Sequence, residues 1–288
     1  MASKSNSHSH IRSISLPCRS HPTTLGIEEE LNKFKAWQRS SSSSETICKD
    51  LCRLAELYKC MDDLLNQPLT IQALISQHQN EKWADEFLDG SLRLVDICGI
   101  TRDVVSQFKE NVRDLQSSLR RRKGDLSMEI SITKYNSFRK KMKKDAKKSI
   151  SALKEIDGCC SEDVSSVIRV LREVNSTSIA IFQNVFLFLS AQSSKPKPRK
   201  WSLVSRLVNK GKVGCENDSQ KVENELENVD LALHCLCRNV QSENEKIQLV
   251  QNRLETLEGG IEGVENGLEG LFRCLIRSRT SLLNILSC

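Results

Sequence analysis

The sequence predicts an all-α fold, an elongated multi-helix bundle with a disordered N-terminal tail and a long C-terminal heptad-patterned helix or helical hairpin. Three observations support this prediction. Glycine and proline number only 12 and 5 among 288 residues, too few to punctuate many short strands. Apolar residues recur at helical spacing through most of the chain. A heptad pattern then continues over the last quarter of the chain.

Residues 1–26 are predicted to form a basic, serine-rich, disordered tail. No acidic residue occurs before Glu28, a composition that is also typical of an organellar transit peptide. Pro17 and Pro22 disfavour the amphipathic helix that such a peptide needs. Organellar targeting is therefore the less favoured interpretation.

The tail contains two candidate phosphorylation sites. Ser13 and Ser15 follow Arg12, and basic-directed kinases favour such contexts. A phosphate would add about −1.5 to −2 charges to this basic segment. The alternative is an unmodified tail.

Residues 27–193 are predicted to form a helical bundle. Its first helix runs to about Trp37, and the serine run at 40–44 makes a flexible joint. Thr46 is a candidate cap for the second helix, because threonine hydroxyls accept bonds from helix N-terminal amides. Pro68 is expected to end that helix before a shorter one.

A further helical pattern begins at Trp83. Gly99 is expected to break it. The next predicted helix covers 101–122 and ends in the basic cluster at 120–123, which complements the helix dipole. Gly124 is expected to close this helix.

An amphipathic basic helix is predicted at about 127–157. At 100° per residue its apolar face comprises Tyr135, Phe138, Met142, Ala146, Ile150 and Leu153, and the opposite face comprises Arg139, Lys140, Lys141, Lys143, Lys144, Lys147 and Lys148. The positive charge thus lies on one side of a regular helix.

The most apolar segment lies at 161–192. Its apolar run at 179–190 is interrupted by Gln183 and Asn184 and falls short of the ~18–20 residues that cross a bilayer. Burial in the bundle core is therefore expected. A basic, proline-broken linker with a short helix is predicted to follow at 194–218.

Residues 219–287 are predicted to form an acidic, coiled-coil-type helical segment that packs on the bundle. A four–three repeat runs from Val222 to Ile285, and seventeen of its nineteen positions are apolar. The adjacent Gly259 and Gly260 raise two alternatives. The favoured one is a bend or hairpin there, and the other is a close-packed neighbour that uses the small residues.

The charges fall into two blocks of opposite sign. Residues 120–148 carry twelve basic and three acidic side chains, whereas 216–269 carry thirteen acidic and four basic ones. We expect the two blocks to interact, within one molecule or between two copies. The candidate contacts for an acidic partner or an anionic lipid are Arg139, Lys140, Lys143, Lys144, Lys147 and Lys148.

Other uses of the basic helix remain open. A plain solvated face, an anionic membrane surface and a nuclear localisation signal are all compatible with it. Nucleic acid is disfavoured, because the run lacks interleaved aromatic residues and any known nucleic-acid-binding pattern.

No catalytic, cofactor or metal motif emerges, so no enzyme, cofactor or small-molecule substrate is predicted. His234, Cys235 and Cys237 are adjacent but lack a second ligand pair. Cys48 with Cys52 and Cys159 with Cys160 likewise lack completing residues. The chain has 12 cysteines without a regular framework or secretory signal, which favours reduced thiols in a cytoplasmic or nuclear setting.

Several longer motifs resemble one plant family. They are RSISLPCRSHP at 12–22, LAELYKCMDDLLNQPLTIQAL at 54–74, WADEFLDGSLRLVDICGITRD at 83–103, LQSSLRRR at 115–122, WSLVSRLV at 201–208 and GLEGLFRCLIRSRTSLLNILS at 267–287. Together they are similar to domain-of-unknown-function family 241, which is related to the Bypass proteins. The resemblance implies a plant source, an all-helical fold and a role in root and shoot development, and it implies no catalytic residues.

The combined expectation is a non-enzymatic helical interaction protein that binds protein partners or self-associates. The alternative is a peripheral membrane adaptor that uses the basic helix and the apolar segment 179–189. A cytoplasmic location is expected, with membrane-peripheral and nuclear locations as alternatives.

Overall fold

The computed structural model describes residues 24–37, 43–78, 83–121, 125–155, 165–191, 224–237 and 243–287, and every regular element among them is an α-helix. The predicted all-α fold is confirmed. The tail over 1–23 with Ser13 and Ser15, the 194–218 linker and the Cys159–Cys160 pair lie outside the described residues.

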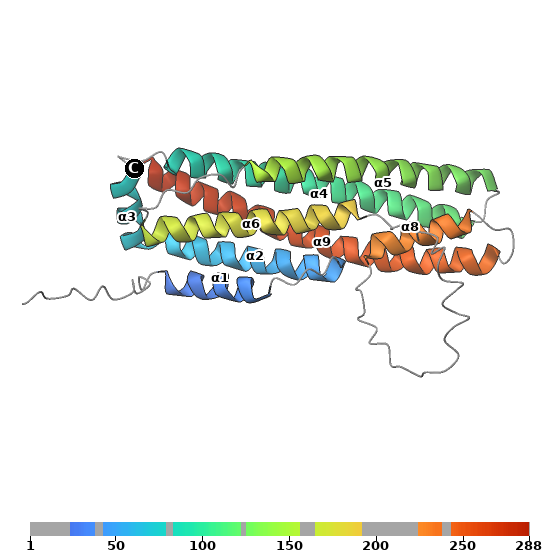
Figure 1. The fold of residues 1–288 in the computed structure, drawn as a ribbon, viewed down its shortest axis with the longest axis horizontal. Helices are drawn as coiled ribbons and strands as arrows, with labels where there is room; N and C mark the ends of the chain where they lie inside the picture. The colour runs from blue at the N-terminus through green and yellow to red at the C-terminus, as the bar shows by residue number, and fades with distance from the viewer. Residues whose placement is uncertain are drawn as a thin grey trace, which may run out of the picture.

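The helices lie side by side and form a rod (Figure 1). They are α1 (Leu25–Trp37), α2 (Ser44–Leu65), α3 (Pro68–His78), α4 (Trp83–Arg121), α5 (Asp125–Lys154), α6 (Ser166–Ser190), α8 (Glu225–Leu236) and α9 (Glu243–Leu286).

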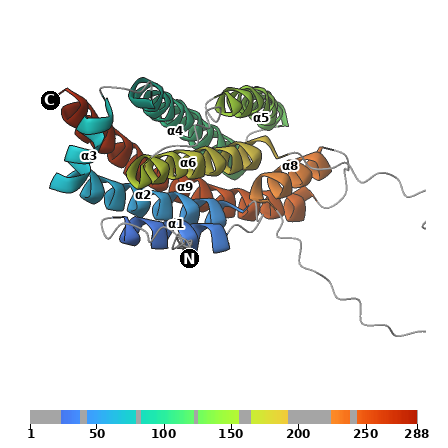
Figure 2. The same ribbon diagram turned by 60° about the vertical axis from the view of Figure 1, so that its left-hand side comes forward.

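Helix α9 is the central element of the rod and packs against α2, α4 and α8 (Figures 1 and 2). The predicted heptad stripe is the side that it buries. Its buried members on α8 and α9 are Leu226, Val229, Leu233, Leu236, Val250, Leu254, Leu257, Ile261, Val264, Leu268, Leu271, Leu275, Ser278, Leu282 and Ile285. Since a fully buried leucine contributes roughly 1.5–3 kcal/mol, this stripe is a main source of stability.

The bend or hairpin expected at Gly259 and Gly260 is not found there. Helix α9 continues through both glycines, and the hairpin instead lies between α8 and α9, after Cys237. Arg253 donates from Nη1 to the Asn228 carbonyl at 2.7 Å, which ties the two antiparallel arms together.

Three glycines of α9 agree with the second alternative, in which small residues allow a neighbouring helix to pack closely. A Cβ atom at Gly260 would lie 2.7 Å from Ser44 Cβ, one at Gly263 would lie 2.8 Å from Cys48 Sγ, and one at Gly267 would lie 3.0 Å from Leu51 Cβ. All three neighbours belong to α2, which runs parallel to α9. The missing side chains therefore allow α2 to approach α9 closely, which offsets the low helix propensity of glycine.

Helix α4 is also continuous, so the expected break at Gly99 is wrong. A Cβ atom there would make an ordinary contact at 3.8 Å with Phe272 of α9, and Leu94, Cys98 and Val105 on either side are buried. The burial of this stripe outweighs the roughly 1 kcal/mol that one glycine costs a helix.

The start of α2 differs from the expectation in its cap. Ser43, not Thr46, occupies the N-cap position, and its Oγ accepts from the Thr46 amide at 3.3 Å. The carboxylate of Glu225 also accepts from the Ser44 amide at 3.1 Å and from the Ser44 hydroxyl at 2.8 Å. An acidic side chain at this position complements the positive end of the helix dipole.

Helix α6 carries the apolar segment predicted for the core. Its buried residues between 179 and 189 are Ile179, Ile181, Phe182, Val185, Phe186, Phe188 and Leu189, so that prediction is confirmed. Within the described part of the chain, no helix has both the length and the apolarity to cross a membrane.

The glycines allow a test with opposite expected signs. Gly259→Ala and Gly270→Ala meet nothing within 4 Å, so each should raise the free energy of unfolding by about 0.5–1 kcal/mol through helix propensity. Gly260→Ala should lower it by roughly 1–3 kcal/mol, because two Cβ atoms would overlap. Urea denaturation followed by circular dichroism measures all three, and equal stabilisation at Gly260 would disprove the close α2–α9 contact.

Candidate functional site

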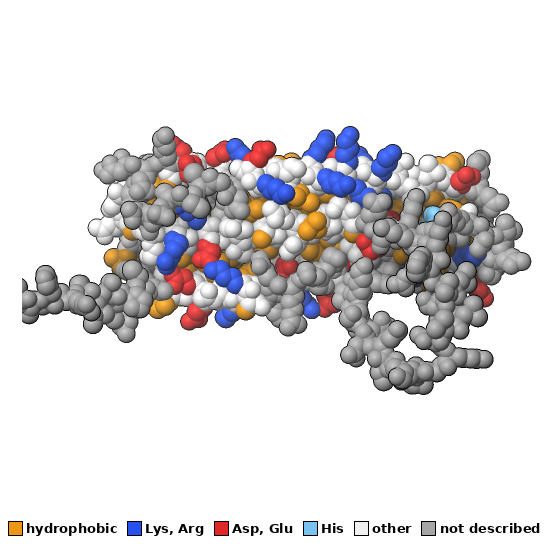
Figure 3. Space-filling view, viewed as in Figure 1, with side chains coloured by type: hydrophobic (Ala, Val, Ile, Leu, Met, Phe, Trp, Pro, Cys, Tyr) orange, Lys and Arg blue, Asp and Glu red, His pale blue; other side chains and the backbone are white. Residues whose placement is uncertain are grey.

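The basic helix α5 forms an outer layer against α4 and α6. Its apolar face is buried as predicted at Tyr135, Met142, Ala146 and Leu153. Five lysines on the other side are exposed, namely Lys140, Lys141, Lys144, Lys147 and Lys148. We call these five residues the lysine row, and Figure 3 shows blue side chains gathered over α5. No ion pair joins the lysine row to any other residue that the structure describes.

Two of the predicted contact residues lie elsewhere. Arg139 is only 2% exposed, so it does not belong to the solvated face, and Lys143 is half-buried. At 100° per residue, Arg139 lies about 40° round the helix from Tyr135 and about 60° from Met142, on the edge of the apolar side. The spacing in the sequence already contained this signal, but the run of basic residues masked it.

Arg139 closes the C-terminal end of α6. Its Nη1 donates to the Leu189 carbonyl at 2.9 Å and its Nη2 to the Ala191 carbonyl at 2.9 Å. Asn224 adds a bond from Nδ2 to the Phe188 carbonyl at 3.3 Å. The Leu189 and Ala191 carbonyls at the end of α6 are thus satisfied, and the cation complements the negative end of the dipole.

Asp230 of α8 balances the buried guanidinium. Its Oδ2 lies 3.0 Å from Arg139 Nη2 and 3.2 Å from Lys143 Nζ, and its Oδ1 accepts from the Tyr135 hydroxyl at 3.3 Å. Burial, followed by the nearby Asp230 carboxylate, raises the pKa of Tyr135 well above its ordinary value. The Arg139 guanidinium also lies over the Phe108 ring, 5.8 Å from its centroid. This cluster joins α4, α5, α6 and α8.

The two predicted charge blocks meet at Asp230. Beyond this contact, acidic residues of α9 form ion pairs with cations of α4 that lie outside the 120–148 block. Lys109 Nζ is 2.6 Å from Glu265, Arg113 Nε is 2.6 Å from Glu258, and Arg102 pairs with Glu269. The hydrogen bond from Arg113 lowers the pKa of Glu258, and that from Lys109 lowers the pKa of Glu265.

A groove of about 200 Å³ lies between α4 and α5. Its lining comprises Ile100, Asp103, Val104, Gln107, Phe138, Lys141, Met142 and Asp145. Phe138 stacks on Phe108 with ring centroids 5.9 Å apart, which fixes the floor of the groove. The lysine row therefore borders a shallow apolar depression.

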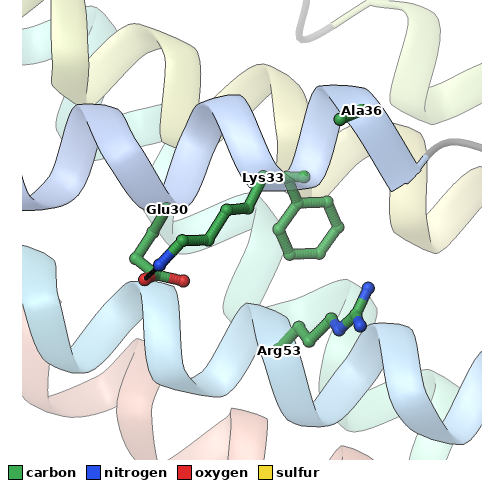
Figure 4. A pocket seen from close by; sticks show the side chains of 5 residues that line it. Glu30, Lys33, Ala36 and Arg53 are labelled. Carbon is green, nitrogen blue, oxygen red and sulfur yellow. Dashed lines mark hydrogen bonds and ion pairs between the residues drawn. The ribbon is translucent and has the colours of Figure 1, made fainter.

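A second depression of about 380 Å³ lies between α1 and α2. Figure 4 shows Lys33 of α1 directed towards Glu30, with Arg53 on α2 opposite. Lys33 Nζ donates to Glu30 at 2.6 Å, and this bond raises the pKa of Lys33. The lysine charge is thus already balanced by its neighbour.

Four of the described cysteines are not activated thiols. Burial raises the pKa of Cys98 to about 12 and also raises the pKa values of Cys48, Cys60 and Cys274. These four thiols are therefore protonated near neutral pH. His234, Cys235 and Cys237 lie exposed at the end of α8, and no group of three or more potential metal ligands occurs among the described residues.

These features define an elongated helical-bundle protein that presents a basic outer helix beside an apolar groove. The chain belongs to the family described as Protein BPS1, whose model matches residues 50–285. The match begins within α2 and ends within α9, so it covers most of the described bundle, and the resemblance to Bypass-related proteins is confirmed. No curated protein and no solved structure matched the chain.

Removing one partner of the buried Arg139–Asp230 pair should destabilise the fold far more than removing one partner of an exposed pair. Asp230→Ala leaves the buried guanidinium uncompensated and should cost about 3–5 kcal/mol. The control Asp114→Ala removes a pair with Lys134 in which both side chains are exposed, and should cost about 0–1 kcal/mol. Guanidinium denaturation of the full chain measures both, and equal losses would contradict the central role of Asp230.

The α4–α9 ion pairs should make stability depend on acidic pH. Because the folded-state pKa values of Glu258 and Glu265 are lowered, their contribution is present above their ordinary value of 4.5 and is lost as pH falls through the folded values.

The difference between wild type and the double variant Glu258→Gln, Glu265→Gln should therefore be largest well above pH 4.5 and shrink as pH falls through the lowered folded-state pKa values. Urea midpoints across this range measure the effect, with Glu255→Gln, on an exposed position of α9, as the control. A gap of constant size at every pH would rule out the ionised carboxylates as its source.

Proposed function

We propose that the protein is a non-enzymatic helical interaction protein that binds an acidic protein partner through the lysine row of α5. The observation that carries this proposal is the exposure of five lysines on a helix whose opposite face is anchored in the bundle. Membership of the Bypass-related family supports a role in root and shoot development, exercised from the cytoplasm.

The distribution of charge favours a separate partner over self-association. The acidic residues Glu258, Glu265 and Glu269 of α9 are already paired with α4, and Asp230 is paired with Arg139. These four carboxylates are therefore less available to the lysine row of a second copy. An external acidic surface meets the charge requirement directly.

The chemistry of the described side chains supports a binding role rather than catalysis. Four thiols have raised pKa values, and the buried titratable cluster around Asp230 is occupied in holding helix ends together. General acid–base or nucleophilic catalysis needs a group whose pKa matches its task and which faces substrate.

The membrane alternative has fewer apolar side chains available for insertion in this arrangement. Phe182, Val185 and Phe186 of the 179–189 segment are packed in the core, and Met142 of α5 is only 2% exposed. Insertion would require these side chains to leave the bundle at a cost of roughly 1.5–3 kcal/mol each. A purely electrostatic contact of the lysine row with anionic lipid is the form of this alternative that needs no unpacking.

The proposal is tested with a charge-removal variant of α5, Lys140→Gln, Lys144→Gln, Lys147→Gln and Lys148→Gln, in the full chain. Acidic partners recovered from root tissue should be purified and their affinities measured at two salt concentrations. Since exposed pairs contribute about 0–1 kcal/mol each, binding should weaken by about tenfold or more.

A matched control removes four exposed lysines from α1 and α2, namely Lys33, Lys35, Lys49 and Lys59. This control should bind like the wild type. Unchanged partner affinity in the α5 variant would refute the proposal. Flotation with phosphatidylserine vesicles, lost only in the α5 variant, would replace the acidic protein with a membrane surface.

A further inference from the structure

We propose that the partner segment is an acidic amphipathic helix that lies along α5 and inserts an apolar side chain into the α4–α5 groove. This inference rests on the proposed function and specifies the partner of the same surface. It combines three observations, namely the shape of the groove, its apolar floor and the unequal charge of its two rims.

The shape of the groove fits a side chain better than a small molecule. Its volume of about 200 Å³ is below the roughly 300–1,000 Å³ of typical ligand pockets. Its walls are two antiparallel helices, as the pairing of Asp114 with Lys134 and of Ser118 with Ser131 shows. A third helix can lie between such walls and present residues at i, i+3 and i+4 to the depression.

The floor of the groove is apolar and partly uncovered. Ile100 of α4 is 58% exposed, and Val104 and Phe138 are half-buried beside it. An apolar side chain placed here would remove this surface from water, which favours binding. Charge alone therefore does not describe what this site can bind.

The rims of the groove differ in charge. Lys141 lines the α5 side, and Lys144 and Lys148 follow it at i+3 and i+7 on the same side of the helix, over about 10 Å. Asp103 lines the α4 side, and Asp145 lies among the lysines on α5. A ligand fits when its negative charge faces α5 and its apolar edge faces the groove.

The unequal charge of the two rims favours an acidic amphipathic helix over other polyanions as the ligand. A nucleic acid or a bilayer would bring phosphates to both rims and would meet repulsion at Asp103. A helix with glutamates on one edge and leucines on the next avoids that contact, since side chains at i, i+3 and i+4 form separate stripes.

Binding of two synthetic peptides to the full-length protein tests the inference by fluorescence anisotropy. The first is an acidic amphipathic helix with leucines at i and i+4 beside glutamates, and the second replaces the leucines by alanine. We expect the leucine peptide to bind at least tenfold more tightly than the alanine peptide. Ile100→Asp, an exposed position that should leave the fold intact, should remove that difference.

Two charge-matched variants locate the basic rim. Lys141→Gln with Lys148→Gln removes charge beside the groove, whereas Lys140→Gln with Lys147→Gln removes the same charge from the far edge of α5. The first pair should weaken the leucine peptide about tenfold and the second less than threefold. Circular dichroism of each variant confirms that α5 remains folded.

Other outcomes overturn the inference in distinguishable ways. Equal binding of both peptides, or equal loss in both double variants, leaves an electrostatic surface and retains the proposed function without the groove. Absence of peptide binding together with binding to phosphatidylserine vesicles assigns the surface to a membrane and removes both proposals. Absence of binding to either probe removes the amphipathic helix as the ligand.

Discussion

Burial of the apolar stripe of α9 is the constraint on which the rest of the bundle depends. Leu254, Leu268 and Leu282 are fully buried along a helix of 44 residues, and no single neighbour is long enough to cover it. Helices α2, α4 and α8 therefore share the task. Glycines 260, 263 and 267 let α2 lie close on one side, and the carboxylates at 258, 265 and 269 pair with α4 on another. On one side of the stripe, the small glycines thus allow α2 to pack closely. On the other side, the carboxylates hold α4 by charge.

The ion pairs between α4 and α9 determine which charged side chains remain available to bind other molecules. Lys109 and Arg113 neutralise acids that a count of charge blocks would assign to α5. Helix α5 packs on α4 and α6 at the edge of the rod. Among the described carboxylates, Asp230 of α8 reaches it through Arg139 and Lys143, and Asp114 of α4 pairs with Lys134. The lysine row is consequently left facing solvent and forms no ion pair with the described residues. An interaction surface arises here because the α9 carboxylates pair with cations of α4 instead of with the lysine row.

Periodicity in the sequence was sufficient to predict the helices, the buried stripe of α9 and the apolar face of α5, because each depends on spacing within one helix. Gly99 and Gly259 were poor guides to breaks, since the contacts that outweigh glycine's low propensity come from Phe272 and from the burial around both positions. The pairing of Asp230 with Arg139 could not be predicted, because 91 residues separate them and a window of net charge does not say which helices touch. The groove depends in the same way on how α4 and α5 meet.

Arg139 explains why the lysine row has a defined orientation. A helix held only by apolar side chains can rotate or slip with little loss of free energy, since apolar contacts are not directional. The guanidinium of Arg139 instead donates to the Leu189 and Ala191 carbonyls at the end of α6 and to the carboxylate of Asp230, each at 2.9–3.0 Å. Buried pairs of this kind add little net stability but can fix register, because displacing one partner leaves a charge unpaired. With α5 fixed about its axis, Lys141 lies at the groove beside Ile100, while Lys140 and Lys147 lie farther round the helix. The buried Arg139 thus fixes the orientation of the exposed lysine row.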